Sequence, residues 1–139
     1  MTLKEFFQKD HFAALAGAEL LEIRSGYARA RMVVNEHHLN GGGVCQGGAL
    51  FTLADLAFAA AVNSHLILTF STSSNITYVR SVTLGELVYA EAREVVNHPR
   101  MPYVEVRLTD AEGKLVAIFT SSGYRKSDAQ LKDVEPLSE

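Results

Sequence analysis

The chain has very little of what characterises disulfide-rich or nucleic-acid-binding proteins. Among its 139 residues there is one cysteine, Cys45, so no internal disulfide can form and a reducing compartment is indicated. The formal net charge is -3, and lysine and arginine are nowhere clustered. Because binding to a phosphate backbone depends on clustered positive charge, we expect no nucleic-acid partner.

Long hydrophobic runs are also missing. The apolar stretch over residues 49–62 is too short to cross a bilayer, and it contains Asp55. The first residues, Met-Thr-Leu-Lys-Glu-Phe-Phe, lack the basic start and the apolar stretch of a signal peptide. We therefore expect a cytoplasmic protein with no membrane partner.

The size and composition are those of one globular domain over residues 1–139, with 47% hydrophobic residues. A short amphipathic helix is expected over residues 2–15. The tail over residues 126–139 is polar and is expected to be flexible. Apolar and polar alternation, with turn residues between the segments, predicts strands over residues 19–24, 27–34, 66–80, 86–96, 103–109 and 114–124.

Residues 47–65 form the longest expected helix. It is apolar on nearly every face, so other structure should enclose it. An order of two strands, one enclosed helix and then a succession of strands predicts an α+β fold. In this fold a curved antiparallel sheet wraps around one long central helix.

Asp55 is the one charged residue in the run from Gly47 to Val62. A glycine-rich segment, Asn-Gly-Gly-Gly-Val-Cys-Gln over residues 40–46, leads into that run. An ionised carboxylate is costly in apolar surroundings unless it is paired or hydrogen-bonded, so this one should have a role. Asp55 could also be a buried acid whose hydrogen bonds are all made within the protein, but its position after the glycine-rich segment favours a functional site.

Three segments resemble the hotdog-fold acyl-CoA thioesterases, in the branch of the phenylacetic-acid-degradation protein PaaI. The first runs from Asn40 to Asp55 and is similar to the family pattern of Asn, Gly-Gly and Asp at fixed spacing. The other two are residues 71–85 and 113–117. The chain departs from the family at Gln46, where the family usually has histidine, and at Ser81, where proline is common. The resemblance implies hydrolysis of acyl-CoA without a cofactor or metal.

Thioester hydrolysis requires donors for the developing oxyanion and a group that activates or supplies the nucleophile. The first amides of a helix are unpaired and lie at its positive end. We place the thioester oxygen on the amide of Gly47, with Gly48 beside it and without a side chain to block the approach. Asp55 is the candidate base or nucleophile. Burial would raise its pKa and nearby donors would lower it, and the sequence does not decide between them.

Gly47 and Asp55 are eight residues apart, about 12 Å along a helix, so one carbonyl cannot contact both in one chain. Two such helices lying antiparallel about a two-fold axis would bring Gly47 of one copy near Asp55 of the other. We therefore predict a homo-oligomer with two shared sites per dimer. The family resemblance implies a homotetramer.

The resemblance also assigns roles to the other candidates. Asn40 would orient the nucleophilic water or polarise the thioester, and Gln46 would position the reacting groups. Ser71 would help to hold the water, with Ser73 a weaker candidate for contact with the substrate. Arg80 is the first candidate for the phosphates of coenzyme A, together with Arg100 and Arg125, although no spacing supports these three.

Other functions fit the sequence less well than hydrolysis. The glutamine at position 46 makes a non-catalytic acyl-CoA-binding or sensing protein conceivable, because an amide cannot carry a proton as imidazole does. A hydratase or dehydratase is disfavoured, since those enzymes use a histidine near the helix start. No Gly-x-Ser-x-Gly elbow is present, which disfavours a serine hydrolase. The adjacent His37 and His38 are expected at the surface, without a metal.

Overall fold

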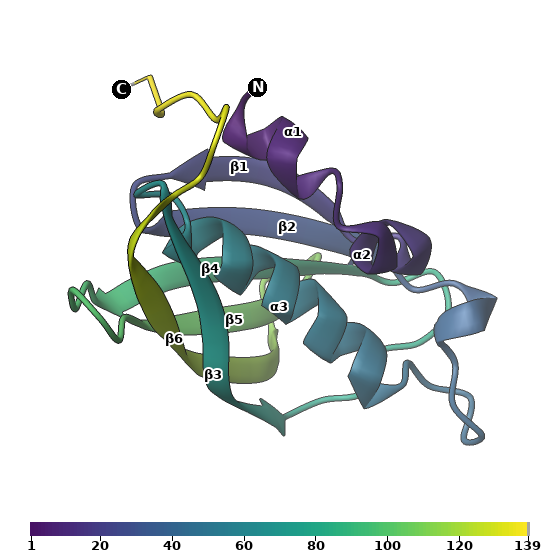
Figure 1. Ribbon diagram of the computed structural model, residues 1–139. Coiled ribbons are helices and arrows are strands. Elements are labelled where there is room, and N and C mark those ends of the chain that lie inside the picture. Colours follow the sequence, from purple (N-terminus) through teal and green to yellow (C-terminus); the bar gives the residue numbers. More distant parts are fainter. Residues whose placement is uncertain (139) are drawn as a thin grey trace.

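The computed structural model describes residues 1–138, except for the side chains of residues 127–129. One antiparallel sheet of six strands, in the order β1-β2-β4-β5-β6-β3, curves around the helix α3 (Figure 1). This confirms the α+β prediction. The strands are β1 (Glu19–Arg24), β2 (Tyr27–Val33), β3 (Ile67–Tyr78), β4 (Leu87–Val96), β5 (Tyr103–Asp110) and β6 (Leu115–Gln130).

The core lies between this sheet and α3, which spans Gly47–Val62. The buried side of α3 carries leucine, phenylalanine and alanine, and these residues pack against buried alanine and valine residues of β2, β4 and β5. Small residues on both sides allow the helix to lie close to the sheet. The helix ends at Val62, three residues before the predicted end, because Asn63 takes the C-cap position. No helix in residues 1–138 is long and apolar enough to cross a membrane.

One side of α3 is not fully covered. Gly48, Thr52, Asp55 and Ala59 follow each other at intervals of three or four residues, and each is more exposed than the buried residues between them. Residues at this spacing lie on one side of a helix. We call these four residues the open stripe. The predicted wrapping of the helix by the sheet is therefore confirmed, with this stripe left partly exposed within one chain.

The N-terminal segment contains two helices where one was predicted. Helix α1 (Leu3–Phe7) begins with a capping box between Thr2 and Glu5. Helix α2 (His11–Ala16) begins at Asp10, whose side chain accepts a hydrogen bond from the amide of Ala13. Aspartate is more favourable at the N-cap of a helix than in its interior, so the first helix ends before Asp10 and a second one begins there.

The last strand extends further toward the C-terminus than predicted. Strand β6 continues to Gln130, which pairs with Ile67 at the start of β3. After the strand, Leu131 and Val134 are buried against Leu3 of α1. The polar composition of residues 126–139 concealed these two anchors, and they hold the segment over the N-terminal helix (Figure 1).

A short 3-10 helix, η1 (Glu36–His38), lies between β2 and the glycine-rich loop. The loop then leads directly into α3, and a bridge between Leu39 and Cys45 closes it. As a result α2, η1 and the start of α3 lie together at one end of the molecule (Figure 1).

Candidate functional site

Asn40 determines the shape of the loop before α3. Its Oδ1 accepts hydrogen bonds from the amides of Gly42 at 2.9 Å and Val44 at 3.2 Å. Its backbone amide donates to the carbonyl of Val44 at 2.8 Å. An asparagine side chain that replaces backbone partners in this way stabilises a tight loop. The amide nitrogen of the side chain is left for other partners, and Asn40 remains exposed.

The start of α3 offers donors that the protein does not use. Gln46 is the N-cap residue, but its side chain makes no capping hydrogen bond. The backbone amide of Gln46 donates to His38 O at 2.7 Å, whereas the amides of Gly47 and Gly48 have no acceptor among residues 1–138. Two unpaired amides at the positive end of a helix can stabilise a developing oxyanion.

Gly47 is in contact with Tyr78, at the end of β3. A Cβ atom on Gly47 would lie 2.5 Å from the hydroxyl oxygen of Tyr78, which is closer than real contacts allow. At Gly48 an added Cβ would meet only the end of the Gln46 side chain, at 2.6 Å. Burial raises the pKa of the Tyr78 phenol, so this hydroxyl keeps its proton at neutral pH. No local sequence pattern points to Tyr78, because a strand end and a helix start meet here only through the fold.

Asp55 lies half-buried on the open stripe. No other residue of the described chain forms a hydrogen bond or an ion pair with its carboxylate. Burial raises its pKa, and the negative charge of Asp10 raises it further. The question that the sequence left open is thus decided by burial. A carboxylate with a raised pKa and no partner is suited to accept a proton from water.

Two cavities flank the start of α3 and divide the candidate residues between them. A cavity of about 290 Å³ is lined by Asn40, Gly47 and Arg80 together with Tyr78. A cleft of about 620 Å³ on the other side is lined by Gln46 and Gly48.

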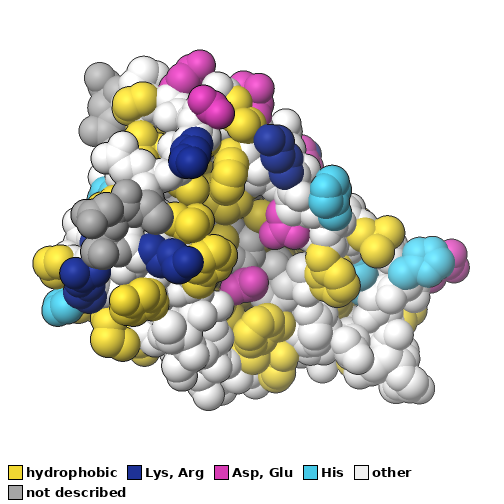
Figure 2. Space-filling model, viewed as in Figure 1, with side chains coloured by type: hydrophobic (Ala, Val, Ile, Leu, Met, Phe, Trp, Pro, Cys, Tyr) yellow, Lys and Arg dark blue, Asp and Glu magenta, His cyan; other side chains and the backbone are white. Residues whose placement is uncertain are grey.

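In the view of Figure 2, acidic side chains lie near the centre of the face of the molecule that is shown, with hydrophobic groups around them.

The three arginines proposed for coenzyme A phosphates are in different situations. Arg80 lies beside the smaller cavity, and its guanidinium forms an ion pair with Asp110. Arg125 is buried, bonded to Glu94 at 3.3 Å, and so cannot serve as a surface cation. Arg100 is exposed in the turn after β4, at the other end of the sheet from the glycine-rich loop.

Ser71 and Ser73 are exposed on β3, and neither lines the two cavities beside the start of α3. Ser71 is seven residues from Tyr78, about 23 Å along a strand. Since Tyr78 contacts Gly47, Ser71 cannot reach the start of α3 in the same chain. Like Asp55, it lies away from the start of the helix. One chain therefore presents Asn40 and Gly47 in one place and Asp55 in another.

Comparison with known proteins identifies the family. The model of the thioesterase superfamily matches residues 42–117. The chain belongs to the thioesterase superfamily. It is 38% identical over 122 residues to a protein of Archaeoglobus fulgidus, covering 88% of this chain and 79% of that one. It is 29% identical over 119 residues to the acyl-coenzyme A thioesterase PaaI of Escherichia coli, covering 86% and 85% of the two chains.

Solved structures agree with this assignment. The E. coli PaaI structure superposes with a TM-score of 0.87 at 26% identity, covering 94% of this chain and 92% of the other. A mutant of PaaI from Thermus thermophilus gives 0.81 at 35% identity, covering 84% and 100%. The predicted hotdog fold, the PaaI-like family and thioester hydrolysis are confirmed. Gln46 in place of histidine does not take the chain out of the family.

Proposed function

We propose that this thioesterase hydrolyses acyl-CoA to a free acid and coenzyme A, at sites that each combine residues of two copies of the chain. The acyl-CoA substrate is supported by the similarity to E. coli PaaI, which is named as an acyl-coenzyme A thioesterase. The observation that carries the proposal is the separation of Asp55 from the unpaired Gly47 amide. The two groups lie eight residues apart on one helix, about 12 Å, so neither alone completes a site.

A second copy can supply the missing half. Strand β3 is at an edge of the sheet and pairs on one side only, with β6. Its exposed side chains include the large apolar residues Phe70 and Tyr78. An exposed edge of this length favours pairing with another strand. Pairing of two β3 strands about a two-fold axis would place two α3 helices antiparallel, with their open stripes facing each other.

The residues then have complementary roles. Asp55 and Ser71 of one copy hold the nucleophilic water, or Asp55 itself attacks the thioester carbon, expels the thiolate and forms an anhydride that water then hydrolyses. Gly47 of the other copy binds the carbonyl oxygen through its amide, while Asn40 and Gln46 orient the reacting groups. When water attacks, Asp55 takes its proton, the carbon–sulfur bond breaks and the coenzyme A thiolate leaves and is protonated. Gly48, Arg80 and Ser73 would contact other parts of the substrate.

We further propose that two such dimers form a homotetramer, as the family resemblance implies. The cytoplasm is the compartment that we propose, because the single thiol, Cys45, is free and buried, as suits a reducing environment.

Mixed oligomers test the shared site. Asp55→Asn and Gly47→Val are first each expressed alone, and each homo-oligomer should be inactive. The two chains are then co-expressed with different affinity tags. In a mixed dimer one site carries both substitutions and the other carries neither. A random mixture should regain about a quarter of the wild-type activity per site. Mixed oligomers that form but remain inactive would contradict the shared site. Binding of acyl-CoA by the wild type without any turnover would contradict the activity itself.

A further inference from the structure

The hydroxyl group of Tyr78 lies beside the start of α3 and makes no hydrogen bond with any residue that the structure describes. It faces the cavity of about 290 Å³, which Asn40 and Gly47 also line. The backbone amide of Gly47 has no acceptor in the described chain either. Two unused donors, one from a strand and one from a helix, therefore meet at this cavity.

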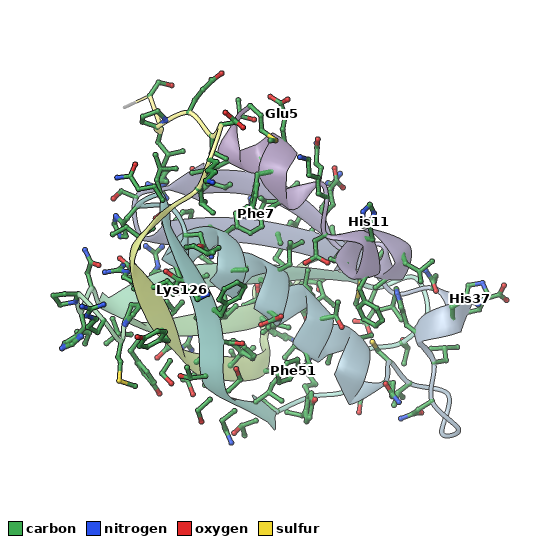
Figure 3. All side chains as sticks on the ribbon, viewed as in Figure 1. Glu5, Phe7, His11, His37, Phe51 and Lys126 are labelled. Atoms are coloured by element: carbon green, nitrogen blue, oxygen red, sulfur yellow. The ribbon has the colours of Figure 1, made fainter. Side chains whose placement is uncertain are left out.

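The alternation of side chains along β3 directs the Tyr78 ring toward the helix. Ile76 and Tyr78 are two residues apart on a strand, so they point to the same face of the sheet. Ile76 packs against the core and pairs with Phe119 of β6. Phe51 of α3 packs against Phe119 with ring centroids 5.2 Å apart, and it lies between the helix and this end of β3 (Figure 3). Tyr78 is the next residue on this face after the core ends, and its ring reaches the start of α3.

The distance between the two donors allows them to share one oxygen atom. A Cβ atom on Gly47 would lie 2.5 Å from the hydroxyl oxygen of Tyr78. Two bonds of about 1.5 Å each would link that Cβ to the amide nitrogen, so the hydroxyl and the amide are at most about 5.5 Å apart. Two hydrogen bonds of about 2.9 Å can span this distance through a common acceptor. A thioester oxygen that accepts from the amide can therefore accept from the phenol as well.

Backbone hydrogen bonds hold the two donors in place relative to each other. The amide of Cys45, two positions before α3, donates to Val82 O, four positions after β3, at 2.9 Å. The amide of Val79 donates to Val116 O at 2.8 Å, which fixes the end of β3. The loop before the helix is thus joined to the segment after the strand. Donors that are fixed in advance need no rearrangement when charge develops on a substrate.

His38 holds the start of α3 from the other side, where α2 and η1 enclose the larger cleft. Its carbonyl accepts from the amide of Gln46 at 2.7 Å. Its Nδ1 accepts from the amide of Asn35 at 3.0 Å, so the ring proton is on Nε2, which donates to Ala16 O at 2.6 Å. His38 is buried, whereas the sequence predicted a surface histidine. Its neighbour His37 is exposed as predicted (Figure 3).

The surroundings of Tyr78 keep its hydroxyl available as a donor. Burial raises the pKa of the phenol above its usual value of about 10, and Cys45 raises it further. Burial also raises the pKa of the Cys45 thiol. Arg80, which lines the same cavity, is paired with Asp110. The phenol is therefore neutral at pH 7 and is not bonded to an anion of the described chain.

We propose that Tyr78 is a catalytic residue, whose hydroxyl donates a hydrogen bond to the thioester oxygen together with the amide of Gly47. The inference rests on the proposed acyl-CoA thioesterase function. When the nucleophile adds to the carbonyl carbon, this oxygen becomes negatively charged, and both donors bind it more strongly than they bind the substrate carbonyl. The phenol keeps its proton throughout. When the carbonyl forms again, the electron pair of the carbon–sulfur bond leaves with the sulfur.

Tyr78→Phe tests the hydroxyl, because it keeps the ring beside Gly47 and removes only the donor. With an acyl-CoA substrate kcat should fall about a hundredfold, as expected for the loss of one oxyanion donor. KM should change less than about threefold, because the interaction is strong only in the transition state. Tyr103→Phe is the matched control, since Tyr103 is 39% exposed at the start of β5, away from the loop before α3, and it should keep both constants.

Thermal unfolding checks that each variant is folded. A folded Tyr78→Phe protein that keeps the wild-type kcat would overturn the inference. A variant that loses only in KM would overturn it too, because the hydroxyl would then bind the substrate and not the transition state.

A binding measurement separates this inference from the proposed function. S-trifluoroacetonyl-CoA is hydrated in water and presents a tetrahedral carbon, whereas S-acetonyl-CoA presents an ordinary carbonyl. Tyr78→Phe should weaken binding of the first compound about tenfold and that of the second less than about twofold. Equal loss for both compounds, or none for either, overturns the role of Tyr78. A wild type that hydrolyses no acyl-CoA would contradict the proposed function, and the two compounds would still decide the inference.

Discussion

The two ends of α3 differ in how fully their polar groups are bonded. At the start, Gln46 gives no side-chain cap, and the next two amides have no acceptor in the described chain. At the other end, the Asn63 side chain makes three hydrogen bonds. Its Nδ2 donates to Ala59 O at 2.9 Å and to Thr69 O at 3.1 Å, and its Oδ1 accepts from Thr69 N at 2.8 Å.

The bonding at the far end extends beyond Asn63. Ser64 Oγ donates to Ala61 O at 2.7 Å and accepts from Gly26 N at 2.8 Å. His65 Nε2 lies 2.9 Å from Glu94 Oε2, and Glu94 also binds the buried Arg125. These bonds connect the end of α3 to the turn between β1 and β2, to β3, to β4 and to β6.

This contrast explains how one helix can serve both stability and chemistry. A substrate oxygen can be stabilised only by donors that the fold leaves unpaired, and such donors stabilise the folded state less than paired ones do. The densely bonded end holds the helix in place, so the start can remain open. Substitutions at the two ends of α3, and one at Asp55 between them, test this division between an active start and a structural end.

The largest effect is expected for Asp55→Asn. The amide keeps the shape of the carboxylate but cannot accept the proton or attack, so kcat should fall about a thousandfold. Steady-state kinetics with the best acyl-CoA substrate measure the loss. Asp10→Asn is the control, because it removes a nearby charge and leaves the carboxylate of Asp55 in place. Retention of wild-type kcat by a folded Asp55→Asn protein would exclude the catalytic role.

The same substitution should alter the dependence of stability on pH. Burial raises the pKa of Asp55 in the folded state, so between the unfolded and the folded pKa the folded protein holds more protons. Stability then decreases as pH rises through that window. Asp55→Asn should unfold at a higher temperature than the wild type at neutral pH, and the difference should vanish below a pH of about 3.9, the usual aspartate value. On the acid side of the pH profile, kcat/KM should fall with a midpoint above that usual aspartate value.

Gly47→Ala should have the second-largest effect. The new methyl group would meet the hydroxyl of Tyr78 at 2.5 Å, so the ring or the start of the helix must shift next to the amide that binds the thioester. A displacement of about 1 Å can lower the rate about a hundredfold, and we expect that loss in kcat/KM. Gly41→Ala is the control, because a Cβ there meets nothing within 4 Å. Equal activities of the two variants would remove the argument for close approach at Gly47.

Asn63→Ala tests the structural end and should leave the chemistry unchanged. It removes three hydrogen bonds and leaves Thr69 N–H buried without its partner, which should lower the free energy of unfolding by about 2 kcal/mol. Urea denaturation measures the loss, and Asn97→Ala, in the exposed turn after β4, should show almost none. A drop in kcat for Asn63→Ala under conditions where it is folded would contradict the division.

The sequence predicted the parts of the fold that depend on local patterns. Alternating residues placed the first five strands within two residues of their observed ends, and the apolar run located α3. The end of β6 was missed because residues 126–130 are polar, and their pairing depends on β3, which is distant in the sequence. The break at Asp10 was missed because an aspartate can lie within a helix as well as cap one.

The candidate site was predicted only in part, for a similar reason. Asn40, Gln46, Gly47 and Asp55 lie in one segment, so spacing and resemblance found them together. Tyr78 and the cleft of α2 and η1 depend on contacts between distant segments. Arg125 was interpreted as a surface cation, yet its charge is paired with Glu94 inside the protein, which composition cannot reveal.

The smallest effect is expected for Gln46→His, which restores the residue usual in the family. The Gln46 side chain is exposed and makes no capping bond, so its amide can donate to a substrate oxygen. A neutral imidazole can donate in the same way. If position 46 only positions groups, kcat at pH 8 should change less than about threefold, within the range of one altered hydrogen bond. A rise of a hundredfold would mean that a proton carrier is needed here, and that the start of α3 contributes more than its open amides.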